Sequence, residues 1–417
     1  MLVVGLDAAD WAIAEPLMRA GRMPHLARLT ARGVRGELAS FPVRSPNRSN
    51  SAAIWTTIAT GKSPERHGVT DFAVRRPDGG WRLFTSSDRR VKAFWNALSE
   101  RGLRVGVVGW WATWPAEAVN GEMVSGEFWP TRRASGDACR GCVEGSRPDA
   151  DIPGATWPPS LGEELAGLRV FEADLASAPA AAVHHGVWGA ADYWPYARDS
   201  TMAMVAERLL STRRYDAFAV HLQSLDIVSH LAWVCRPGPR FLAYCPRFDR
   251  FSGRVDRYYE FVDGLLGRLL AAAGEGATTL VVSDHGYGTY DDLRELELRA
   301  GRMLGEMSPE ERARLGADRE ASSGHTDRAL VAAAGPRVRR GRPIAGAVAD
   351  LGATILALAG APPARDMDGK VLSFVRPAPA AAIESYESPA STRSVPATRP
   401  GDAEVLDRLK ALGYLAD

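Results

Sequence analysis

The sequence predicts a three-layer α/β/α fold, in which helices lie on both sides of a central, mostly parallel sheet. Short apolar runs rich in β-branched residues recur along the chain and alternate with helical segments, a rhythm typical of parallel sheets. Polar residues that can bind metals follow several of these runs, at the strand ends where open α/β sheets bind ligands. Of the 417 residues, 46% are hydrophobic and 24% are charged, which is an ordinary globular composition.

The clearest predicted strand is the run from Thr278 to Val282, which is followed by the small-residue turn Ser283-Asp284-His285-Gly286. A β-branched apolar run of this kind predicts a strand buried on both faces. Asp284 and His285 would then stand at its carboxyl end, where both side chains can bind a metal. An Asp-His pair alone occurs often by chance, so its weight comes from matching residues at other strand ends.

The first residues, Leu2 to Leu6, predict another central strand, and Asp7 stands where it ends. Asp7 has two interpretations: a polar group at a strand end, or the cap of a helix within Ala8–Ala20. The stretch from Pro24 to Gly33 predicts a short helix, because proline suits its first turn and glycine its end.

The stretch from Ser45 to Gly61 begins as a polar turn and continues as an Ala-rich helix that Gly61 is placed to end. Ser49, Asn50 and Ser51 lie at the helix N-terminus, where unpaired N–H groups and the helix dipole favour an anion. This position suits a nucleophile that attacks a phosphate. The alternative is that one of the three residues merely caps the helix.

A helix is predicted from Val91 to Leu98 and a strand from Leu103 to Gly109, after which the rhythm breaks. From Trp110 to about Trp194 the chain is rich in Pro, Gly and Trp, and seven of the 12 tryptophans fall there. We interpret residues from about 110 to 200 as an irregular Trp-rich insertion that caps the strand ends. Its aromatic side chains would either line a substrate pocket or fill the core of a small subdomain.

A helix from Thr201 to Leu210 and a strand from Phe218 to Leu222 follow. Asp226 and His230 come just after this strand and are four residues apart, so they share one face if the segment is helical. That arrangement suits the binding of one ion, and an ordinary surface pair is the alternative. His221, inside the strand, is predicted to be a core histidine.

The amphipathic segment from Val255 to Leu270 predicts a helix that packs on the sheet. His325 lies in a Gly/Ser loop before a predicted strand from Ala329 to Ala334, and Ala347 to Leu358 predicts a last core helix. Residues 377–417 read as a linker rich in Pro and Ala and a short C-terminal helix, which leaves residues 1–376 as the main domain.

Composition also limits partners and compartment. The net charge of +1 gives no nucleic-acid or membrane-surface footprint. No apolar run approaches the roughly 18 residues of a membrane-spanning helix. The first residues lack the features of a signal peptide, so we expect a cytoplasmic protein. The oligomeric state stays open.

Four cysteines form one tight pair, Cys139 and Cys142, and one loosely spaced pair, Cys235 and Cys245. In a reducing compartment they would be a structural zinc site, a redox pair or plain thiols. A zinc ribbon normally has two tight pairs, which disfavours zinc here. We expect the tight pair to serve the insertion structurally.

Seven residues near strand ends or helix starts form the candidate site. They are Asp7, Ser51, Asp226, His230, Asp284, His285 and His325. Three carboxylates, three imidazoles and a hydroxyl would give two divalent ions mixed oxygen and nitrogen ligands.

Together with Gly61, Pro64-Glu65-Arg66-His67-Gly68 and Asp366–Val371, this order of motifs resembles the alkaline phosphatase superfamily. Within it the chain resembles the type I phosphodiesterase/nucleotide pyrophosphatase branch, from residue 1 to about residue 375. The resemblance implies that residues 1–376 are an alkaline phosphatase-like catalytic domain, with a central sheet between helices.

The resemblance also implies two divalent metal ions, usually zinc, with manganese as the alternative. It divides the ligands into two sets. One is Asp226, His230 and His325, and the other is Asp7, Ser51, Asp284 and His285. By its distance from Gly61, Ser51 matches the family's Thr/Ser nucleophile, while His67 would be structural.

Two comparisons with the wider superfamily bear on the substrate. Diesterases of this branch usually carry an Asn soon after the His-Gly motif, and this Asn helps to bind a phosphate oxygen. The corresponding stretch here, Gly68–Phe72, contains no Asn, so that contact is absent or is made by Asn47 or Asn50. Arylsulfatases on the same fold need Cys or Ser two residues before the Pro of a C/S-x-P-x-R motif. Here Arg44 precedes Ser45–Arg48, which argues against formylglycine chemistry.

We therefore expect metal-dependent hydrolysis of a small-molecule phosphate ester, a phosphodiester or nucleotide pyrophosphate, through a phosphoserine intermediate on Ser51. The alternatives are a phosphomonoesterase or phosphoryl transferase on the same site, and a non-catalytic metal-binding regulatory protein. The complete ligand set favours an enzyme. Two sets of side chains bear on whether the substrate is a phosphate monoester or a diester. The candidate charge clamps are Lys62, Arg44 and Arg48, and the candidate stacking residues are Trp110, Trp111, Trp114 and Trp129.

Overall fold

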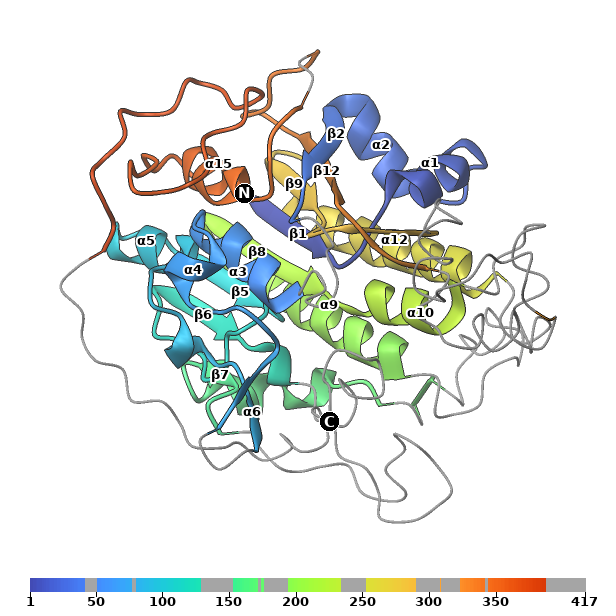
Figure 1. Cartoon of the computed structure of the whole chain (residues 1–417), viewed down its shortest axis with the longest axis horizontal. Helices are drawn as coiled ribbons and strands as arrows, with labels where there is room; N and C mark the ends of the chain where they lie inside the picture. The colour runs from blue at the N-terminus through green and yellow to red at the C-terminus, as the bar shows by residue number, and fades with distance from the viewer. Residues whose placement is uncertain are drawn as a thin grey trace.

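The chain folds around one eight-stranded sheet. The computed structural model describes residues 1–41, 51–76, 80–128, 153–171, 174–175, 194–233, 253–289, 308, 323–341 and 344–387. The sheet strands are β1 (Leu2–Leu6), β2 (Val34–Ala39), β5 (Val105–Val108), β6 (Gly121–Val124), β7 (Thr156–Trp157), β8 (Ala217–Leu222), β9 (Thr279–Val282) and β12 (Arg328–Ala334). Their order is β2-β12-β9-β1-β8-β5-β6-β7 (Figure 1).

The sheet is mixed but mostly parallel, which confirms the predicted fold class. β1 pairs in parallel with β8 and β9, and Leu2 lies opposite both Phe218 and Thr279. β5 pairs in parallel with β8 and β6, whereas β12 is antiparallel to β9 and β2, and β7 is antiparallel to β6. The carboxyl ends of β9, β1 and β8 therefore lie side by side at one edge of the sheet.

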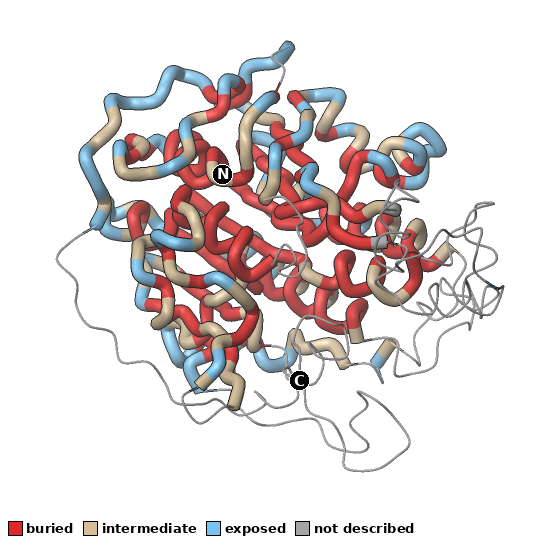
Figure 2. The backbone as a smooth tube through the Cα atoms, in the orientation of Figure 1, coloured by how far each residue is buried: buried red, intermediate tan, exposed pale blue. Residues whose placement is uncertain are grey.

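Helices cover both faces because the side chains of a strand alternate between them. Leu2, Val4 and Leu6 enter one hydrophobic core and Val3 enters the other. The first core packs against α1 (Trp11–Arg19), α2 (Pro24–Arg32), α9 (Trp194–Thr212), α10 (Ser224–Ala232) and α12 (Arg254–Ala273). The second packs against α3 (Ser51–Thr60), α5 (Phe94–Glu100) and α15 (Asp350–Leu358). Figure 2 shows the buried residues running through the centre between these layers.

Shorter elements complete the described chain. They are α4 (Pro64–His67), β3 (Ala73–Arg75), β4 (Trp81–Leu83), α6 (Leu161–Leu165), β10 (Gly286–Thr289), β11 (Ser323–Thr326) and the 3-10 turns Ser86–Asp88, Gly126–Phe128 and Ala166–Leu168. β10 and β11 pair antiparallel in a separate two-stranded sheet, as do β3 and β4.

Several predicted boundaries shift. The helix expected within Ala8–Ala20 begins at Trp11, and its cap is Asp10, whose side chain accepts a hydrogen bond from the N–H of Ala12. The capping interpretation of Asp7 is therefore wrong. β6 and β7 come from the Trp-rich segment, so part of that segment extends the central sheet.

Some predictions fall on parts of the chain that the structure does not describe. These are the C-terminal helix, the four cysteines and much of the proposed insertion. Within the part that it does describe, none of the helices combines the length and the apolar character that a bilayer crossing requires.

Candidate functional site

Three neighbouring strands bring polar side chains to one edge of the sheet. Asp7 follows β1, and Asp284 and His285 follow β9. Asp226 lies in the first turn of α10, shortly after β8. Because β9, β1 and β8 are adjacent and run the same way, these residues converge. Asp7, Asp284 and His285 are fully buried, and Asp226 is 5% exposed.

Helix α10 carries two of the candidate ligands on one face. Asp226 and His230 are one turn apart, with His230 Nε2 3.4 Å from Asp226 Oδ1. The start of this helix is fixed by the fully buried Asp199 of α9. Its carboxylate accepts hydrogen bonds from the N–H and the hydroxyl of Ser224 at 3.2 and 2.9 Å, and from the hydroxyl of Tyr258 at 2.9 Å.

The short β10–β11 pair brings His325 to the same place. In its register Tyr287, two residues after His285, lies opposite His325. The rings of His285 and His325 stack, with centroids 3.8 Å apart and an interplanar angle of 18°. A Cβ on Gly286 would lie 2.2 Å from Asp10 Oδ2 and 2.4 Å from Thr326 Oγ1, so this close pairing needs glycine there.

Asp226, His230 and His325 form the first group that could hold a cation. His325 Nε2 lies 3.1 Å from Asp226 Oδ1 and 2.9 Å from His230 Nε2. The ligand atoms of all three lie within 4.8 Å of one another. Burial opposes ionisation of Asp226, but His230 and His325 outweigh it and hold the pKa of this carboxyl well below its usual value. The group therefore presents an anionic oxygen between two imidazoles.

Ser51 belongs to the second group. It is the first residue of α3 and is 2% exposed. Its Oγ lies 3.2 Å from Asp7 Oδ1 and 3.1 Å from His285 Nε2. His285 Nε2 also lies 3.2 Å from Asp284 Oδ2. The four residues that the family resemblance assigns to one set thus lie together.

The tautomer of His285 can be deduced from its other nitrogen. Nδ1 lies 3.0 Å from the carbonyl oxygen of Gly286, so Nδ1 carries the proton and Nε2 presents a lone pair. Burial first, and then His325, lower the pKa of His285 to about 4, so the ring is neutral at neutral pH. A neutral imidazole that donates its second N–H to a carbonyl is the usual form of a metal ligand.

The carboxylates of the site show why a cation fits. Oδ2 of Asp284 is buried and accepts no hydrogen bond from a described residue. Burial, followed by the nearby Asp7 carboxylate and then Asp226, raises the pKa of Asp284. One ligand atom each of Asp7, Asp226 and His285 also lie within 4.8 Å of one another, so Asp226 stands between the two groups. Mutual repulsion of three buried carboxylates is what divalent cations would relieve.

Sequence reasoning missed the contacts that other residues make with Oδ2 of Asp7. The indole N–H groups of Trp55 and Trp111 donate to Asp7 Oδ2 at 3.1 and 3.3 Å, and His221 Nε2 lies 3.4 Å from the same atom. Trp55 is one helical turn after Ser51, a spacing that could have placed it at the site. Trp111 was a candidate stacking residue for the substrate, but nothing in the sequence linked it to Asp7. His221 is a buried histidine as predicted, yet it also contacts the site.

Backbone strain marks the same region. Ala8, directly after Asp7, has φ 60°, and Ala112, directly after Trp111, has φ 51°. Non-glycine residues rarely adopt this left-handed conformation, and such residues often cluster at functional sites. The N–H of Ala8 donates to Asp284 Oδ1 at 3.2 Å, so the strained turn links two candidate ligands.

Lys62 is not available as a charge clamp for substrate. Its ammonium is nearly buried and lies 2.8 Å from both Asp366 Oδ2 and Glu387 Oε1. His67 is fully buried and contacts Thr57 Oγ1 at 3.0 Å and the N–H of Val69 at 3.2 Å, which agrees with a structural role. Both residues fasten the segment after α3.

The candidate stacking tryptophans differ in their exposure. Trp110 and Trp114 are buried in the protein, whereas Trp111 is partly exposed and packs against Phe72 with ring centroids 5.1 Å apart. The other residues singled out for phosphate or aromatic contacts lie outside the described residues. They are Arg44, Asn47, Arg48, Ser49, Asn50 and Trp129.

Comparisons with known proteins agree with this architecture. Residues 1–334 match the family described as type I phosphodiesterase/nucleotide pyrophosphatase. Among solved structures, the 2-O GAG sulfatase BT1596 aligns with 13% identity over 89% of this chain and 72% of its own, with a TM-score of 0.50. A putative sulfatase from Bacteroides thetaiotaomicron VPI-5482 aligns with 12% identity over 89% and 73%, also with a TM-score of 0.50.

Murine ectonucleotide pyrophosphatase/phosphodiesterase 5 aligns with 12% identity over 86% of this chain and 94% of its own, with a TM-score of 0.45. No curated protein matches the sequence. At these identities the two sulfatase structures indicate a shared fold alone.

Proposed function

The chain belongs to the type I phosphodiesterase/nucleotide pyrophosphatase family, and from this premise we propose that it cleaves phosphodiesters or nucleotide pyrophosphates with Ser51 as nucleophile. Membership makes it a phosphoric ester hydrolase. The observation that carries the assignment of Ser51 is its position: the hydroxyl lies within hydrogen-bond distance of both Asp7 Oδ1 and His285 Nε2. Residues 1–376 would be the catalytic domain.

We assign two divalent cations, zinc in the first instance, to the two groups of ligands. Asp226, His230 and His325 would hold one. The second cation would be held by Asp7, Ser51, Asp284 and His285. Bound there, the cations would lower the pKa of the attacking hydroxyl and of water, and would neutralise the charge that develops on phosphate.

The residues of the chain would then divide the work of an in-line displacement. Asp7 Oδ1 and His285 Nε2 orient the Ser51 oxygen, and the strained turn at Ala8 fixes Asp7 relative to Asp284. The Ser51 oxygen forms a bond to phosphorus as the bond to one ester oxygen breaks, and that group leaves as an alcohol after taking up a proton. Water then attacks phosphorus and the bond from phosphorus to the Ser51 oxygen breaks; one proton of the water goes to Ser51, and its hydroxyl stays on the released phosphate product.

A preference for diesters follows from the charges near Ser51. A monoester dianion needs positive charge beyond the metals, as from an Arg or Lys that grips the phosphate. Lys62, the candidate clamp within the described chain, already pairs with Asp366 and Glu387. A diester carries less charge and a second organic group, which the partly exposed ring of Trp111 could contact.

The test combines metal analysis of the purified enzyme with a comparison of matched nitrophenyl phosphate mono- and diesters. We expect two tightly held divalent ions and a higher kcat/KM for the diester. A monoester advantage of more than about tenfold, or about 1.4 kcal/mol in the transition state, would overturn the diester preference. Transfer to an added alcohol in place of water would identify a transferase. Less than one tightly held ion after zinc supplementation would count against the metal centre.

A further inference from the structure

A cavity lies at the opposite edge of the sheet from Ser51. This cleft, of about 1050 Å³, is lined by Thr279, at the start of β9, and by Ala334, at the end of the antiparallel β12. Asp284 and His285 follow the other end of β9. With a strand rise of about 3.3 Å per residue, roughly 15 Å of strand separates the cleft from the site described above. No candidate ligand of that site lines the cleft.

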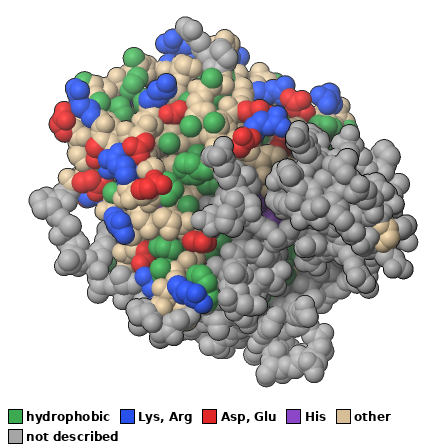
Figure 3. All heavy atoms as spheres, viewed as in Figure 1, with side chains coloured by type: hydrophobic (Ala, Val, Ile, Leu, Met, Phe, Trp, Pro, Cys, Tyr) green, Lys and Arg blue, Asp and Glu red, His purple; other side chains and the backbone are tan. Residues whose placement is uncertain are grey.

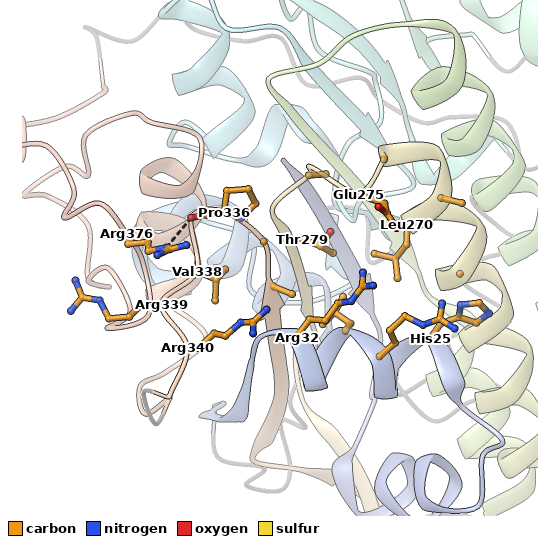
Figure 4. Close-up of a pocket in the computed structure, with 18 residues that line it drawn as sticks. His25, Arg32, Leu270, Glu275, Thr279, Pro336, Val338, Arg339, Arg340 and Arg376 are labelled. Atoms are coloured by element: carbon orange, nitrogen blue, oxygen red, sulfur yellow. Dashed lines mark hydrogen bonds between the residues drawn. The ribbon is translucent and has the colours of Figure 1, made fainter.

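Positive charge is concentrated in this cleft. Its lining contains five arginines and one glutamate, although the whole chain has a net charge of only +1. The arginines are Arg28, Arg32, Arg339, Arg340 and Arg376, and the glutamate is Glu275. Figure 4 shows His25 and Arg32 on the α2 side of the cleft and Arg339, Arg340 and Arg376 on the side formed by the chain after β12. On the face in Figure 3, by contrast, described acidic and basic side chains are interspersed.

The backbone holds the arginines of the second side together. Val338 bridges to Val375, and the N–H of Arg339 donates to the Phe374 carbonyl at 2.7 Å. The Nε–H of Arg376 donates to the Pro336 carbonyl at 2.9 Å, the dashed line in Figure 4. This side is therefore built by two chain segments that are far apart in sequence but joined by hydrogen bonds.

Helix α2 forms the first side and is fixed at its start. Asp263 accepts hydrogen bonds from the N–H groups of His25 and Leu26 at 3.0 and 2.8 Å, so this acid near Arg28 is already engaged. Arg28 and Arg32 are one turn apart, a spacing at which like charges repel. An anion bound between the two sides would relieve that repulsion.

Three of the five guanidinium groups are free to bind such an anion. Within the described chain, Arg32, Arg339 and Arg340 have no side-chain hydrogen bond or ion pair. Guanidinium groups bind phosphate oxygens in bidentate fashion. The cleft is also larger than a lone phosphate needs and has apolar lining from Leu29 and Leu270. We propose that it binds a nucleotide-sized anion that carries at least two phosphate groups.

The probe is α,β-methylene-ADP, whose bridging carbon prevents cleavage between its two phosphates. Calorimetric titration would compare the metal-loaded wild type with the double variant Arg32→Ala/Arg340→Ala. A matched control, Arg19→Ala/Arg365→Ala, removes the same charge from two arginines that are 70% and 66% exposed and lie outside the lining. We expect the Kd to rise at least about tenfold in the cleft variant and to stay within about twofold in the control.

All three proteins should keep the same melting temperature and the same kcat/KM for a nitrophenyl ester, since neither pair of arginines touches the Ser51 site. Equal affinity of the wild type and the cleft variant would place the probe at the Ser51 site and overturn the proposal. So would a lack of saturable binding up to about 1 mM probe. Much tighter binding of a single-stranded RNA to the same arginines would overturn it in favour of a nucleic-acid surface.

Discussion

The hydroxyl oxygen of Ser51 lies 3.1 Å from Nε2 of His285, although 234 residues separate the two in sequence. Ser51 begins α3 and His285 directly precedes β10, so the contact joins a helix start to the end of a central strand. Since Nδ1 of His285 faces the Gly286 carbonyl, it is the lone pair of Nε2 that faces Ser51. The serine thus stands against a neutral imidazole and a carboxylate, the surroundings that a metal-assisted nucleophile requires.

Replacing Ser51 with Ala should abolish turnover and spare the fold. The change removes the nucleophile but leaves the three carboxylates and three imidazoles, so most metal binding should persist. We expect kcat for a nitrophenyl phosphate ester to fall by about a thousandfold or more. Ser49→Ala is the matched control in the same part of the chain. If Ser49→Ala were inactive and Ser51→Ala active, the nucleophile would be misassigned.

Replacing Asp226 with Asn should release metal. Its carboxylate lies within 4.8 Å of ligand atoms in both candidate groups, so its loss weakens both. We expect the variant to hold at least one ion fewer per chain and kcat/KM to fall by about a hundredfold or more. Asp263→Asn, a buried carboxylate that accepts backbone hydrogen bonds at the start of α2, is the control and should keep its metal. Unchanged metal content in Asp226→Asn would refute the ligand assignment.

Asp199 should act on the metal site through α10. Asp199→Ala leaves the N–H and hydroxyl of Ser224 without this acceptor and removes one of the two acceptors near the Tyr258 hydroxyl, the other being the Pro195 carbonyl. We expect a loss of about 2 kcal/mol in the free energy of unfolding. Because Ser224 precedes Asp226 by two residues, metal affinity should also fall by about tenfold. Asp199→Asn, which keeps an acceptor for the Ser224 hydroxyl, should recover part of both losses; a drop in stability with unchanged metal affinity would limit Asp199 to a packing role.

The lowered pKa of His67 predicts that the protein loses stability in acid. Burial first, and then the charge of Arg89, lower the pKa of His67 to about 4, whereas the unfolded chain has an ordinary value near 6.5. Between these values the unfolded state binds the proton and the folded state does not, so stability is lost as pH falls through this window. At about 1.4 kcal/mol per pKa unit, roughly 3 kcal/mol is at stake.

Urea unfolding of wild type and His67→Gln at pH 7 and at about pH 4.5 would measure this contribution. The wild type should lose about 2 kcal/mol more than the variant between the two pH values. Equal losses would show that His67 is protonated in the folded protein.

The strand ends were predictable from the sequence because the signal there is local. Leu2–Leu6 and Thr279–Val282 are continuous apolar runs, and such runs in a parallel rhythm can be placed without knowledge of tertiary contacts. Asp7 and Asp284 follow from them. His325 was harder, because only the β10–β11 pairing brings it to His285, and the motif order supplied that information.

Long-range contacts explain what the sequence did not reveal. Trp111 and Asp7 are 104 residues apart, and no periodicity links them. Lys62 looked like a free cation near the nucleophile, yet its partners Asp366 and Glu387 lie about 300 residues downstream. Charge pairs of this kind depend on where the chain after α15 crosses the surface, which propensity and hydrophobic pattern do not determine.

The covalent intermediate offers the most direct test of the account. The enzyme would be mixed with a nitrophenyl alkyl phosphodiester, quenched in acid within one turnover, digested and analysed by mass spectrometry. We predict that the peptide containing Ser51 carries a phosphoryl group that retains the alkyl ester, and that Ser51→Ala shows no adduct. Steady turnover with no adduct at any time point, or an adduct on a residue other than Ser51, would contradict the proposed mechanism.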